Sequence, residues 1–534
     1  MSWIFKAEAF REKWAYKNAY KDSGRTGTGP IRLFPGARPR RRRRSPILPL
    51  SRARSAIIRM TRHQAVLTLC LLGLLITASI FAPHTTLNTL QALLWTGFCA
   101  NALLRVTAVF LPRRSVKTPY LHPAAMPYYS VIVALYNEAN IVPQVVAAMQ
   151  ALRYPQDRLE ILFALEEDDA DTIAALCATD LPSYMRPILV PVGFPRTKPR
   201  ALNHALTEAR GDLVVIYDAE DRPDPGQLFE AARTFAASPK RLICLQAPLR
   251  PAHAQGFIAR QFAAEYAVQF DVLLPALHYF GLPFPLGGTS NHFRAEALKK
   301  LGGWDAYNVT EDADLGLRLA DSGYASGLLS LPTLETPTAT SHAWIPQRTR
   351  WIKGYIQTLL VHTRLTAPRS LRVWAGVVIG VGLSVLASLC YAPLSFMMVV
   401  TLLLFGLQGT FDPGHAVRDP AMHDLLLFVL GNLAGLIAMQ TGGKRAGLAL
   451  RWRDLFAAPL YWSLQSIAAA FAAHQLFARP FHWDKTDHAP VSVPACQGLP
   501  QKDEPPLYEA AARQYGDEHD HRRHSHNLKN ASLG

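Results

Sequence analysis

The sequence predicts an α/β domain, with a mostly parallel and doubly wound sheet, inserted between transmembrane α-helices. Long apolar runs occur toward both ends of the 534-residue chain, whose mean hydropathy is slightly positive at +0.06. Between these runs, short apolar strands alternate with helical patterns, and acidic residues follow three of the strands. The first observation indicates a membrane protein, and the others indicate a water-soluble insert that binds a ligand at one edge of its sheet.

The N-terminal segment, residues 1–60, is rich in Arg, Pro, Gly and Lys and is predicted to be disordered. The chain carries a formal net charge of +16, and one basic run, Arg38 with Arg40 to Arg44, lies just before an apolar stretch. Such a run could bind nucleic acid or anionic lipid, but its place favours a cytoplasmic flank that sets membrane orientation. Basic and aromatic residues are not interleaved, so nucleic acid is not expected as a partner. Met60 precedes the first membrane segment, and we hypothesise that translation starts either there or at Met1.

Two transmembrane helices are predicted within residues 61–112. The first covers Ala65 to Phe81 and the second covers Leu90 to Leu111, each close to the ~20 residues that cross ~30 Å of hydrocarbon. The polar segment Pro83 to Asn88 is predicted to be the turn between them. Basic residues beyond both outer ends, including Lys117, predict that both flanks lie in the cytoplasm.

Residues 120–365 are predicted to form the soluble domain. Its first half contains three apolar strands and two helices, in the order Tyr129–Leu135 (strand), Ile141–Leu152 (helix), Leu159–Leu165 (strand), Lys198–Arg210 (helix) and Asp212–Tyr217 (strand). This alternation is typical of a parallel sheet with helices on both faces. In such sheets, ligands bind beyond the carboxyl ends of the strands.

Apolar runs return after residue 371, and about four transmembrane helices are predicted in residues 371–478. They cover Val373–Leu389, Ala392–Leu407, Leu425–Met439 and Leu455–Phe477. This count places a basic group on the outer side, against the usual charge distribution: Lys444, Arg445, Arg451 and Arg453. Either that segment is an interfacial or re-entrant helix, or one predicted span is wrong. Residues 479–534 are polar and are predicted to form a cytoplasmic tail.

Acidic residues follow each of the three predicted strands. The clusters are Tyr136-Asn137-Glu138, Glu166-Glu167-Asp168-Asp169 and Asp218-Ala219-Glu220-Asp221. A polar turn explains any one cluster, but three clusters at one sheet edge concentrate negative charge that a cation would offset. Mg²⁺ and Mn²⁺ prefer carboxylate and phosphate oxygens. We therefore expect Asp218 and Glu220 to hold such a cation against a nucleotide diphosphate.

Further segments suit the same chemistry. Lys198, at the start of a predicted helix, is placed to contact a phosphate. Gly287 to Asn291 form a tight loop that allows close backbone approach. Thr310-Glu311-Asp312 reads as a helix start, yet an Asp there could also be the general base that accepts a proton from an acceptor hydroxyl. Gln347 to Gly354 is basic and aromatic, which suits either an interfacial belt or a Trp platform for a sugar.

These residues together resemble the family 2 glycosyltransferases, in particular the membrane-integrated branch of cellulose, curdlan, chitin and hyaluronan synthases. The resemblance covers roughly residues 125–365. It rests on four motifs in the family's order: YNE at Tyr136–Glu138, DAED at Asp218–Asp221, TED at Thr310–Asp312 and QRTRW at Gln347–Trp351. It implies a GT-A-type nucleotide-sugar-binding fold in a bacterial inner-membrane protein with a cytoplasmic catalytic domain.

The resemblance also implies a role for each motif. Nucleotide binding falls to Tyr136, Asn137, Glu138 and Asp168, with Glu166 or Asp169 as alternatives to Asp168. Metal binding falls to Asp218 with Glu220 or Asp221, because this sequence has Glu where the family has its second Asp. Asp312 would be the general base of an inverting displacement. The acceptor and diphosphate site would comprise Gln347, Arg350 and Trp351. The segment Trp483 to Thr486 is similar in place, but not in letters, to the gating loop of cellulose synthase.

Three functions remain open. The first is an inverting, metal-dependent transferase that extends a β-glycan from a nucleotide-diphosphate sugar, with a UDP-sugar as the expected donor and polysaccharide-export subunits as candidate partners. The second is a transferase that adds one sugar to a membrane lipid acceptor. The third is a non-catalytic membrane scaffold or exporter, and the acids at every expected strand end argue against it.

Overall fold

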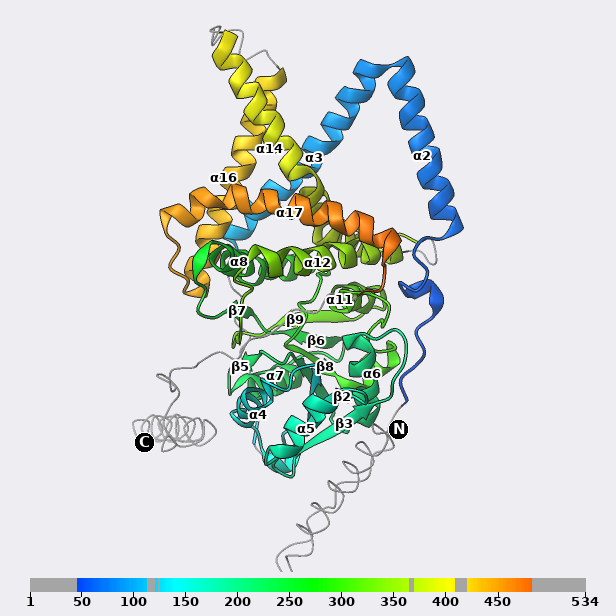
Figure 1. Ribbon diagram of the computed structural model, residues 1–534, viewed down its shortest axis with the longest axis vertical. Helices are drawn as coiled ribbons and strands as arrows, with labels where there is room; N and C mark the ends of the chain where they lie inside the picture. The colour runs from blue at the N-terminus through cyan, green and yellow to red at the C-terminus, as the bar shows by residue number, and fades with distance from the viewer. Residues whose placement is uncertain (1–45, 113–120, 123–124, 365–368, 409–419, 483–534) are drawn as a thin grey trace, which may run out of the picture.

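The computed structural model describes residues 46–112, 121–122, 125–364, 369–408 and 420–482. An α/β domain forms one end of the molecule, helices α8, α12 and α17 lie across it, and helices α2, α3, α14 and α16 extend away on the far side (Figure 1). Three sequence predictions lie outside the described residues. They are the basic run at Arg38 to Arg44, the segment Trp483 to Thr486 and the tail beyond it.

The central sheet has seven strands in the order β3-β2-β1-β4-β8-β6-β9. They are β1 Tyr129–Leu135, β2 Leu159–Glu166, β3 Met185–Val190, β4 Leu213–Tyr217, β6 Leu242–Gln246, β8 Asn291–Arg294 and β9 Ala325–Leu328. Only β8 is antiparallel to its neighbours; the other pairs are parallel. A small second sheet contains β5 Arg222–Pro223, β10 Thr333–Glu335 and β7 Leu249–Pro251.

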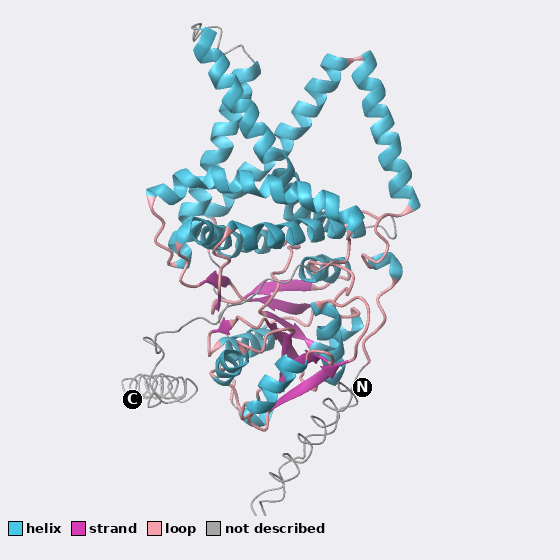
Figure 2. Ribbon diagram, in the orientation of Figure 1, coloured by secondary structure: helices cyan, strands magenta, loops and turns pink. Residues whose placement is uncertain are grey.

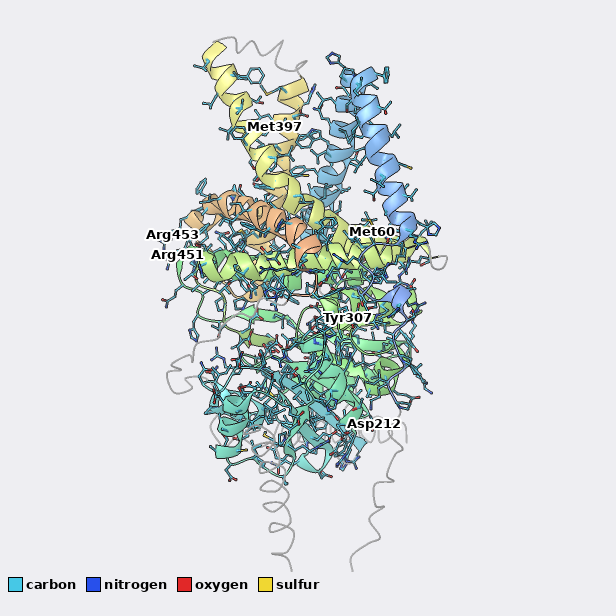
Figure 3. The ribbon with its side chains drawn as sticks, turned by 45° about the vertical axis from the view of Figure 1, so that its right-hand side comes forward. Met60, Asp212, Tyr307, Met397, Arg451 and Arg453 are labelled. Carbon is cyan, nitrogen blue, oxygen red and sulfur yellow. The ribbon has the colours of Figure 1, made fainter. Side chains whose placement is uncertain are left out.

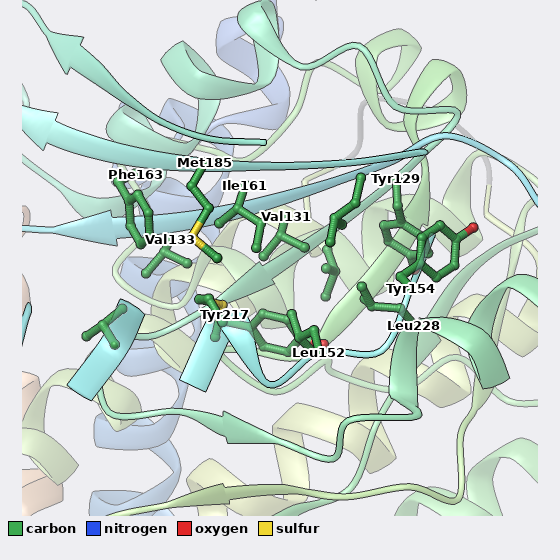
Figure 4. Packing of buried hydrophobic residues seen from close by; sticks show 14 of the residues in the cluster. Tyr129, Val131, Val133, Leu152, Tyr154, Ile161, Phe163, Met185, Tyr217 and Leu228 are labelled. Atoms are coloured by element: carbon green, nitrogen blue, oxygen red, sulfur yellow. The ribbon is translucent and has the colours of Figure 1, made fainter. Parts of the chain in front are cut away.

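Helices cover both faces of the central sheet (Figure 2). They are α4 Val142–Gln150, α5 Ala170–Ala178, α6 Lys198–Glu208, α7 Gln227–Ala237, α10 Ala295–Lys300 and α11 Glu311–Asp321. One core packs α4, α5 and α7 on the sheet through side chains such as Val131, Ile161 and Tyr217 (Figure 4). The other packs α6, α10 and α11 through Ile132, Leu162 and Val214. The predicted doubly wound α/β fold is confirmed, and burial on both faces explains why these strands are almost uniformly apolar.

The parallel register brings the acidic clusters together. Tyr129 of β1 lies opposite both Leu159 of β2 and Leu213 of β4, and all three strands run in the same direction. Their carboxyl ends therefore meet at one edge of the sheet, which faces helices α8 and α12.

The remaining helices include two short ones at the α/β domain, η1 and η3, and those that lie above it or extend to the far side of the molecule. They are η1 Arg52–Arg54, α2 Arg62–Phe81, α3 Pro83–Phe110, η3 Gln156–Arg158, α8 Gly256–Val268, η4 Gln269–Leu273, α9 Leu274–Tyr279, α12 Ser341–His362, α13 Leu371–Val377, η5 Val378–Gly382, α14 Leu383–Gln408, α16 Pro420–Ala446 and α17 Trp452–Ala478. Five stretches in the described chain are long and apolar enough to cross a membrane: Arg62–Phe81, Pro83–Phe110, Leu371–Leu407, Ala421–Ala446 and Trp452–Ala478.

The structure differs from two predictions about these helices. The segment Pro83 to Asn88 is the start of α3 and not a turn, because Pro is well tolerated at the first helical position and Ala82 alone makes the bend. The two spans predicted at 373–389 and 392–407 form one continuous helix through α13, η5 and α14. No polar segment separates them, and Pro393 is accommodated within α14.

The merged helix explains why the predicted spans placed the basic residues from Lys444 to Arg453 on the outer side. With one span fewer, α16 returns toward the α/β domain, and Arg445 donates hydrogen bonds to the carbonyls of Asp271, Val109 and Leu111. Arg451 and Arg453 lie level with α12, whereas Met397 lies toward the far end of α14 (Figure 3). Helix α17 lies along α12, and the two are joined by a hydrogen bond of 3.0 Å from Trp344 Nε1 to Tyr461 Oη.

Residues 46–59, here termed the N-terminal strap, pack on the α/β domain before α2 begins. Ser55 Oγ donates to Asp305 Oδ1 at 2.8 Å, and the Ala56 amide donates to Asp305 Oδ2 at 2.6 Å. The guanidinium of Arg364 donates to the carbonyls of Ala53, Ser55 and Ile58. A chain that started at Met60 would lack every one of these bonds.

Candidate active site

A cavity of about 1220 Å³ lies between the carboxyl edge of the sheet and the helices above it. All three acidic clusters contribute to its wall, together with the TED and QRTRW segments. The predicted site residues that line it are Tyr136, Glu138, Lys198, Asp218, Glu220, Asp312, Gln347, Arg350 and Trp351. The predicted residues Asn137, Asp168 and Asp221 do not line it.

Beside the cavity, Arg196 binds two of the predicted residues, Tyr136 and Asp168. Arg196 donates to Tyr136 Oη at 3.1 Å, pairs with Asp168, and places its guanidinium carbon 5.4 Å from the centre of the Tyr136 ring. The other candidates of the second cluster are engaged elsewhere. Glu166 pairs with Arg200, and Asp169 caps α5 by accepting from the Thr172 amide. Of the three acids predicted to contact the nucleotide, Asp168, Glu166 and Asp169, it is therefore Asp168 that lies beside Tyr136.

Asn137 and Glu138 shape this part of the site through their backbones. Asn137 has a positive φ of 52°, and its amide donates to Asp169 Oδ2 at 2.5 Å. The Glu138 amide donates to Thr172 Oγ1 at 2.9 Å, while the Glu138 side chain is buried in the cavity wall. The turn after β1 is thereby tied to the start of α5.

The DAED segment separates its acids into two roles. Asp221 is buried and turned inward: it accepts from the Asp218 amide at 2.7 Å and from the Thr289 hydroxyl. Burial, followed by the charges of Asp218 and Glu220, raises the pKa of Asp221 well above its ordinary value. Asp218 and Glu220 face the cavity. Glu220, and not Asp221, therefore lines the cavity beside Asp218.

Lys198 is the cation nearest to Asp218. Its ammonium pairs with Asp218 and donates to the Gly288 carbonyl at 3.0 Å. Burial favours the neutral amine, but the charges of Asp218 and Glu311 outweigh it and raise the pKa of Lys198. The ammonium therefore stays charged and partly offsets the carboxylates.

The donor set fits a hard divalent cation only in part. Asp218 and Glu220 offer carboxylate oxygens at the cavity wall, the ligand type that Mg²⁺ and Mn²⁺ take. Within the described ranges, no group of three His, Cys, Asp or Glu side chains is arranged to hold a metal. These two carboxylates would therefore need oxygens from a bound diphosphate to complete the coordination shell.

Glu335 is a buried acid that the sequence analysis missed. It ends β10, lines the cavity, and is within the electrostatic reach of Glu220 and Asp218. Burial, followed by these two charges, raises the pKa of Glu335 to about 8. Its position depends on the pairing of β10 with β5 and β7, and no local sequence pattern predicts that pairing.

Asp312 lies in the first turn of α11 and faces Gly288. A Cβ atom on Gly288 would be 3.6 Å from Asp312 Oδ2, so the carboxylate approaches backbone that also binds Lys198. Burial raises the pKa of Asp312 to about 6, although helix-start amides and the charges of Lys198 and Arg350 act in the opposite direction. Its neighbour Glu311 is also buried and also has a raised pKa. A carboxylate with such a pKa can accept a proton near neutral pH.

Helix α12 holds the loop before Asp312 in place. Gln357 Oε1 accepts from the Val309 amide at 3.1 Å, and Thr358 Oγ1 accepts from Asn308 Nδ2 at 3.0 Å. A Cβ atom on Gly354 would lie 2.3 Å from Thr310 Oγ1, so only glycine permits this close approach. The final Gly of the QRTRWIKG segment is therefore required by packing.

The QRTRW residues divide between the cavity and the scaffold. Gln347, Arg350 and Trp351 line the cavity, and the charge of Arg350 acts on both Glu311 and Asp312. Arg348 also lines the cavity, but it is buried, pairs with Glu265 at 2.8 Å, and lies 4.3 Å from the centre of the Trp351 ring. The segment thus lines the cavity and also packs against the neighbouring helices.

The cavity continues beyond α12 among the long helices. Its lining there includes Leu94, Phe98, Asn101 and Arg105 of α3, Ser384, Ser388 and Tyr391 of α14, Asn432 and Met439 of α16, and Gln465 of α17. Arg105 Nε donates to Asn101 Oδ1 at 3.1 Å, and Tyr391 Oη donates to Asn432 Oδ1 at 2.5 Å. Polar groups at this level, in helices that are otherwise apolar, suit a polar ligand that reaches between them.

Comparison with known proteins supports an enzyme of sugar transfer. The Glycosyl transferase family 2 model matches residues 130–294, and the Glycosyl transferase family group 2 model matches residues 213–411. The chain is 28% identical over 298 residues to the beta-monoglucosyldiacylglycerol synthase of Synechocystis sp., covering 53% of this chain and 61% of that one. It is 28% identical over 244 residues to the UDP-forming cellulose synthase catalytic subunit of Pseudomonas fluorescens, covering 44% and 32%.

The match covers less than two thirds of either relative's length. Among solved structures, a mannosyltransferase from Pyrobaculum calidifontis in complex with GDP-Man and Mn²⁺ aligns with a TM-score of 0.45 at 19% identity, covering 73% of this chain and 98% of that one. The two matching models overlap and run from the first strand of the central sheet into the helices beyond α12. Residues 130–411 of this chain are therefore similar to family 2 glycosyltransferase domains.

Proposed function

We propose that this protein transfers a sugar from a nucleotide-diphosphate sugar, with a UDP-sugar as the first candidate, to a growing β-glycan at the bacterial inner membrane. The observation that carries the proposal is the continuity of the cavity, which runs from Asp218 and Asp312 to Arg105 and Asn432 between the long helices. A chain of sugars could occupy such a path while its end lies beside Asp312.

The donor would lie along the carboxyl edge of the sheet. Tyr136 and Asp168, with Arg196, would bind the nucleoside, and Lys198 and Arg350 would contact the diphosphate. Asp218 and Glu220 would hold Mg²⁺ or Mn²⁺, which when bound supplies Lewis-acid stabilisation of the departing diphosphate. Apart from Arg350, which lies within α12, these side chains follow strand ends or lie at the start of α6 and in the loop before it, so the fold would align the donor across the sheet edge.

Transfer would proceed by a single displacement. Asp312 accepts the proton of the acceptor hydroxyl as its oxygen attacks the anomeric carbon. The bond from that carbon to the diphosphate breaks in the same step, which inverts the configuration. Gln347 and Trp351 line the wall beside Asp312 and would position the acceptor sugar. With Arg445 and Arg453 on the domain side, the catalytic domain would lie in the cytoplasm.

A membrane lipid acceptor is the second candidate. The part of the cavity between the long helices also exposes Leu94, Phe98 and Met439, which would suit acyl chains. One of the similar proteins is a glycolipid synthase. Both candidates use the same donor site and the same general base, so the product distinguishes them.

The test is donor turnover by the full chain in nanodiscs. Radiolabelled UDP- and GDP-sugars would be supplied with Mg²⁺ or Mn²⁺, beside an Asp312→Asn variant. We expect a high-molecular-weight product that the variant makes at least ~100-fold more slowly, the size of effect typical for loss of a general base. A small glycolipid product would favour the second candidate. Equal rates in both proteins would refute the role of Asp312.

A further inference from the structure

Three aromatic rings from distant parts of the chain contact one another, and two of them, Phe194 and Phe481, line the cavity. Phe194 lies in the loop between β3 and α6, Tyr307 lies in the loop before α11, and Phe481 follows α17. The ring centres of Phe194 and Tyr307 are 6.3 Å apart, and those of Tyr307 and Phe481 are 5.3 Å apart. Both contacts are edge-on, at interplanar angles of 65° and 76°. Tyr307 lies just below α12 (Figure 3). These three rings are here termed the ring cluster.

Phe194 leaves most of its surface uncovered. It is 77% exposed although it lines the cavity, and Phe481 lines the same space. Arg196 and Lys198 follow it at alternate positions and also line the cavity. The loop thus presents an aromatic face, a guanidinium and an ammonium in the order in which a nucleoside diphosphate presents a base, a ribose and phosphates.

The third ring is held in place by buried bonds. Lys353 is fully buried, and its Nζ donates to Gln475 Oε1 at 2.9 Å, to the His482 carbonyl at 3.0 Å and to the Arg479 carbonyl at 3.3 Å. Gln357 Nε2 donates to the Pro480 carbonyl at 2.9 Å. Because Gln357 also binds the Val309 amide, one helix fixes both Phe481 and the loop that carries Tyr307.

We propose that the ring cluster binds the nucleoside of the donor, with the base stacked on the exposed face of Phe194 and with Tyr307 and Phe481 closing the edge of that stack. This inference rests on the proposed function, because it requires a nucleotide donor. A base offers a flat face for the ring and a polar edge for Asp168 and Arg196, which pair beside Tyr136. Lys198 then lies where the diphosphate begins.

The test measures binding of UDP and GDP, with Mn²⁺, to the full chain in nanodiscs by calorimetry, with inorganic pyrophosphate as the second probe. Phe194→Ala and Phe481→Ala are each expected to weaken binding of the preferred nucleotide roughly tenfold. Their affinity for pyrophosphate should stay unchanged, since the phosphate contacts at Lys198 remain. Phe194→Tyr keeps a ring and should bind like the wild type.

Phe280→Ala is the matched control, because Phe280 is also well exposed, at 48%, but does not line the cavity. If the wild type binds neither nucleotide, the proposed function itself fails. If the wild type binds and either cluster variant binds equally well, the ring cluster is refuted while the proposed function stands. Parallel loss of nucleotide and pyrophosphate would also refute it, because the ring would then support the loop and not the base.

Discussion

Burial and nearby positive charges shift the pKa of Asp312 in opposite directions. Burial raises the pKa of its carboxyl to about 6, against the lowering effect of Lys198 and Arg350. A general base acts in its deprotonated form, so the active fraction rises as pH rises through that value. We expect kcat at saturating donor to decrease as the pH is lowered through about 6. An Asp with an ordinary pKa would cause this decrease about two pH units lower. A rate that stays constant down to pH 4 would contradict this.

The acids of the site show what a sequence can assign and where it stops. Position after strands β1, β2 and β4 placed Tyr136, Asp168 and Asp218 correctly at one edge. Asp169 and Asp221 belong to the same clusters, yet they bind amides within their own turns. Whether an acid points into the cavity or back to its own turn depends on the side-chain direction, which the sequence does not show. Other groups, such as Glu335, Arg196 and Phe194, reach the site on loops or short strands whose placement depends on distant pairing.

At the scale of elements, the periodic and apolar segments were the predictable ones. The three predicted strands and α6 match the structure within one or two residues. The helix from Leu371 to Gln408 was divided in error because its 38 residues exceed the length of one span. Its first turns pack on the α/β domain, where Val377 and Val381 contact Leu317. Length alone therefore overcounted the spans.

The N-terminal strap was also mispredicted, as disordered, because its stability comes from partners far along the chain. A chain that starts at Met60 leaves Asp305 and Arg364 without the partners described above, and both are buried. We expect it to be destabilised by about 3–5 kcal/mol, because five hydrogen bonds to Asp305 and Arg364, each worth ~1 kcal/mol net, are exchanged for bonds to water. Thermal unfolding would measure this against a matched chain that starts at residue 46, which retains the strap. Equal melting temperatures would show that the strap contributes nothing.

At the scale of the whole molecule, the architecture assigns each end of the long helices to a side of the membrane. Arg453 and the α/β domain should share one side, and Leu407, at the far end of α14, should lie on the other. Two separate spans at 373–389 and 392–407 would instead put Arg453 opposite the domain. The two arrangements therefore differ in the side on which Arg453 lies, which labelling can measure.

We expect single cysteines to report this directly in sealed vesicles of one orientation. In a background lacking the six native cysteines, Arg453→Cys should react with an impermeant maleimide under the same conditions as Lys240→Cys, a reference in the α/β domain. Leu407→Cys, which is 84% exposed in the wild type as Leu, should react only from the opposite face. If Arg453→Cys and Leu407→Cys were both labelled from the same face of the vesicle, the single continuous helix would not be a membrane span. In the expected arrangement, the basic end of α16 lies beside the carbonyls of α3 and η4, so positive charge gathers on the side where the negatively charged donor must bind.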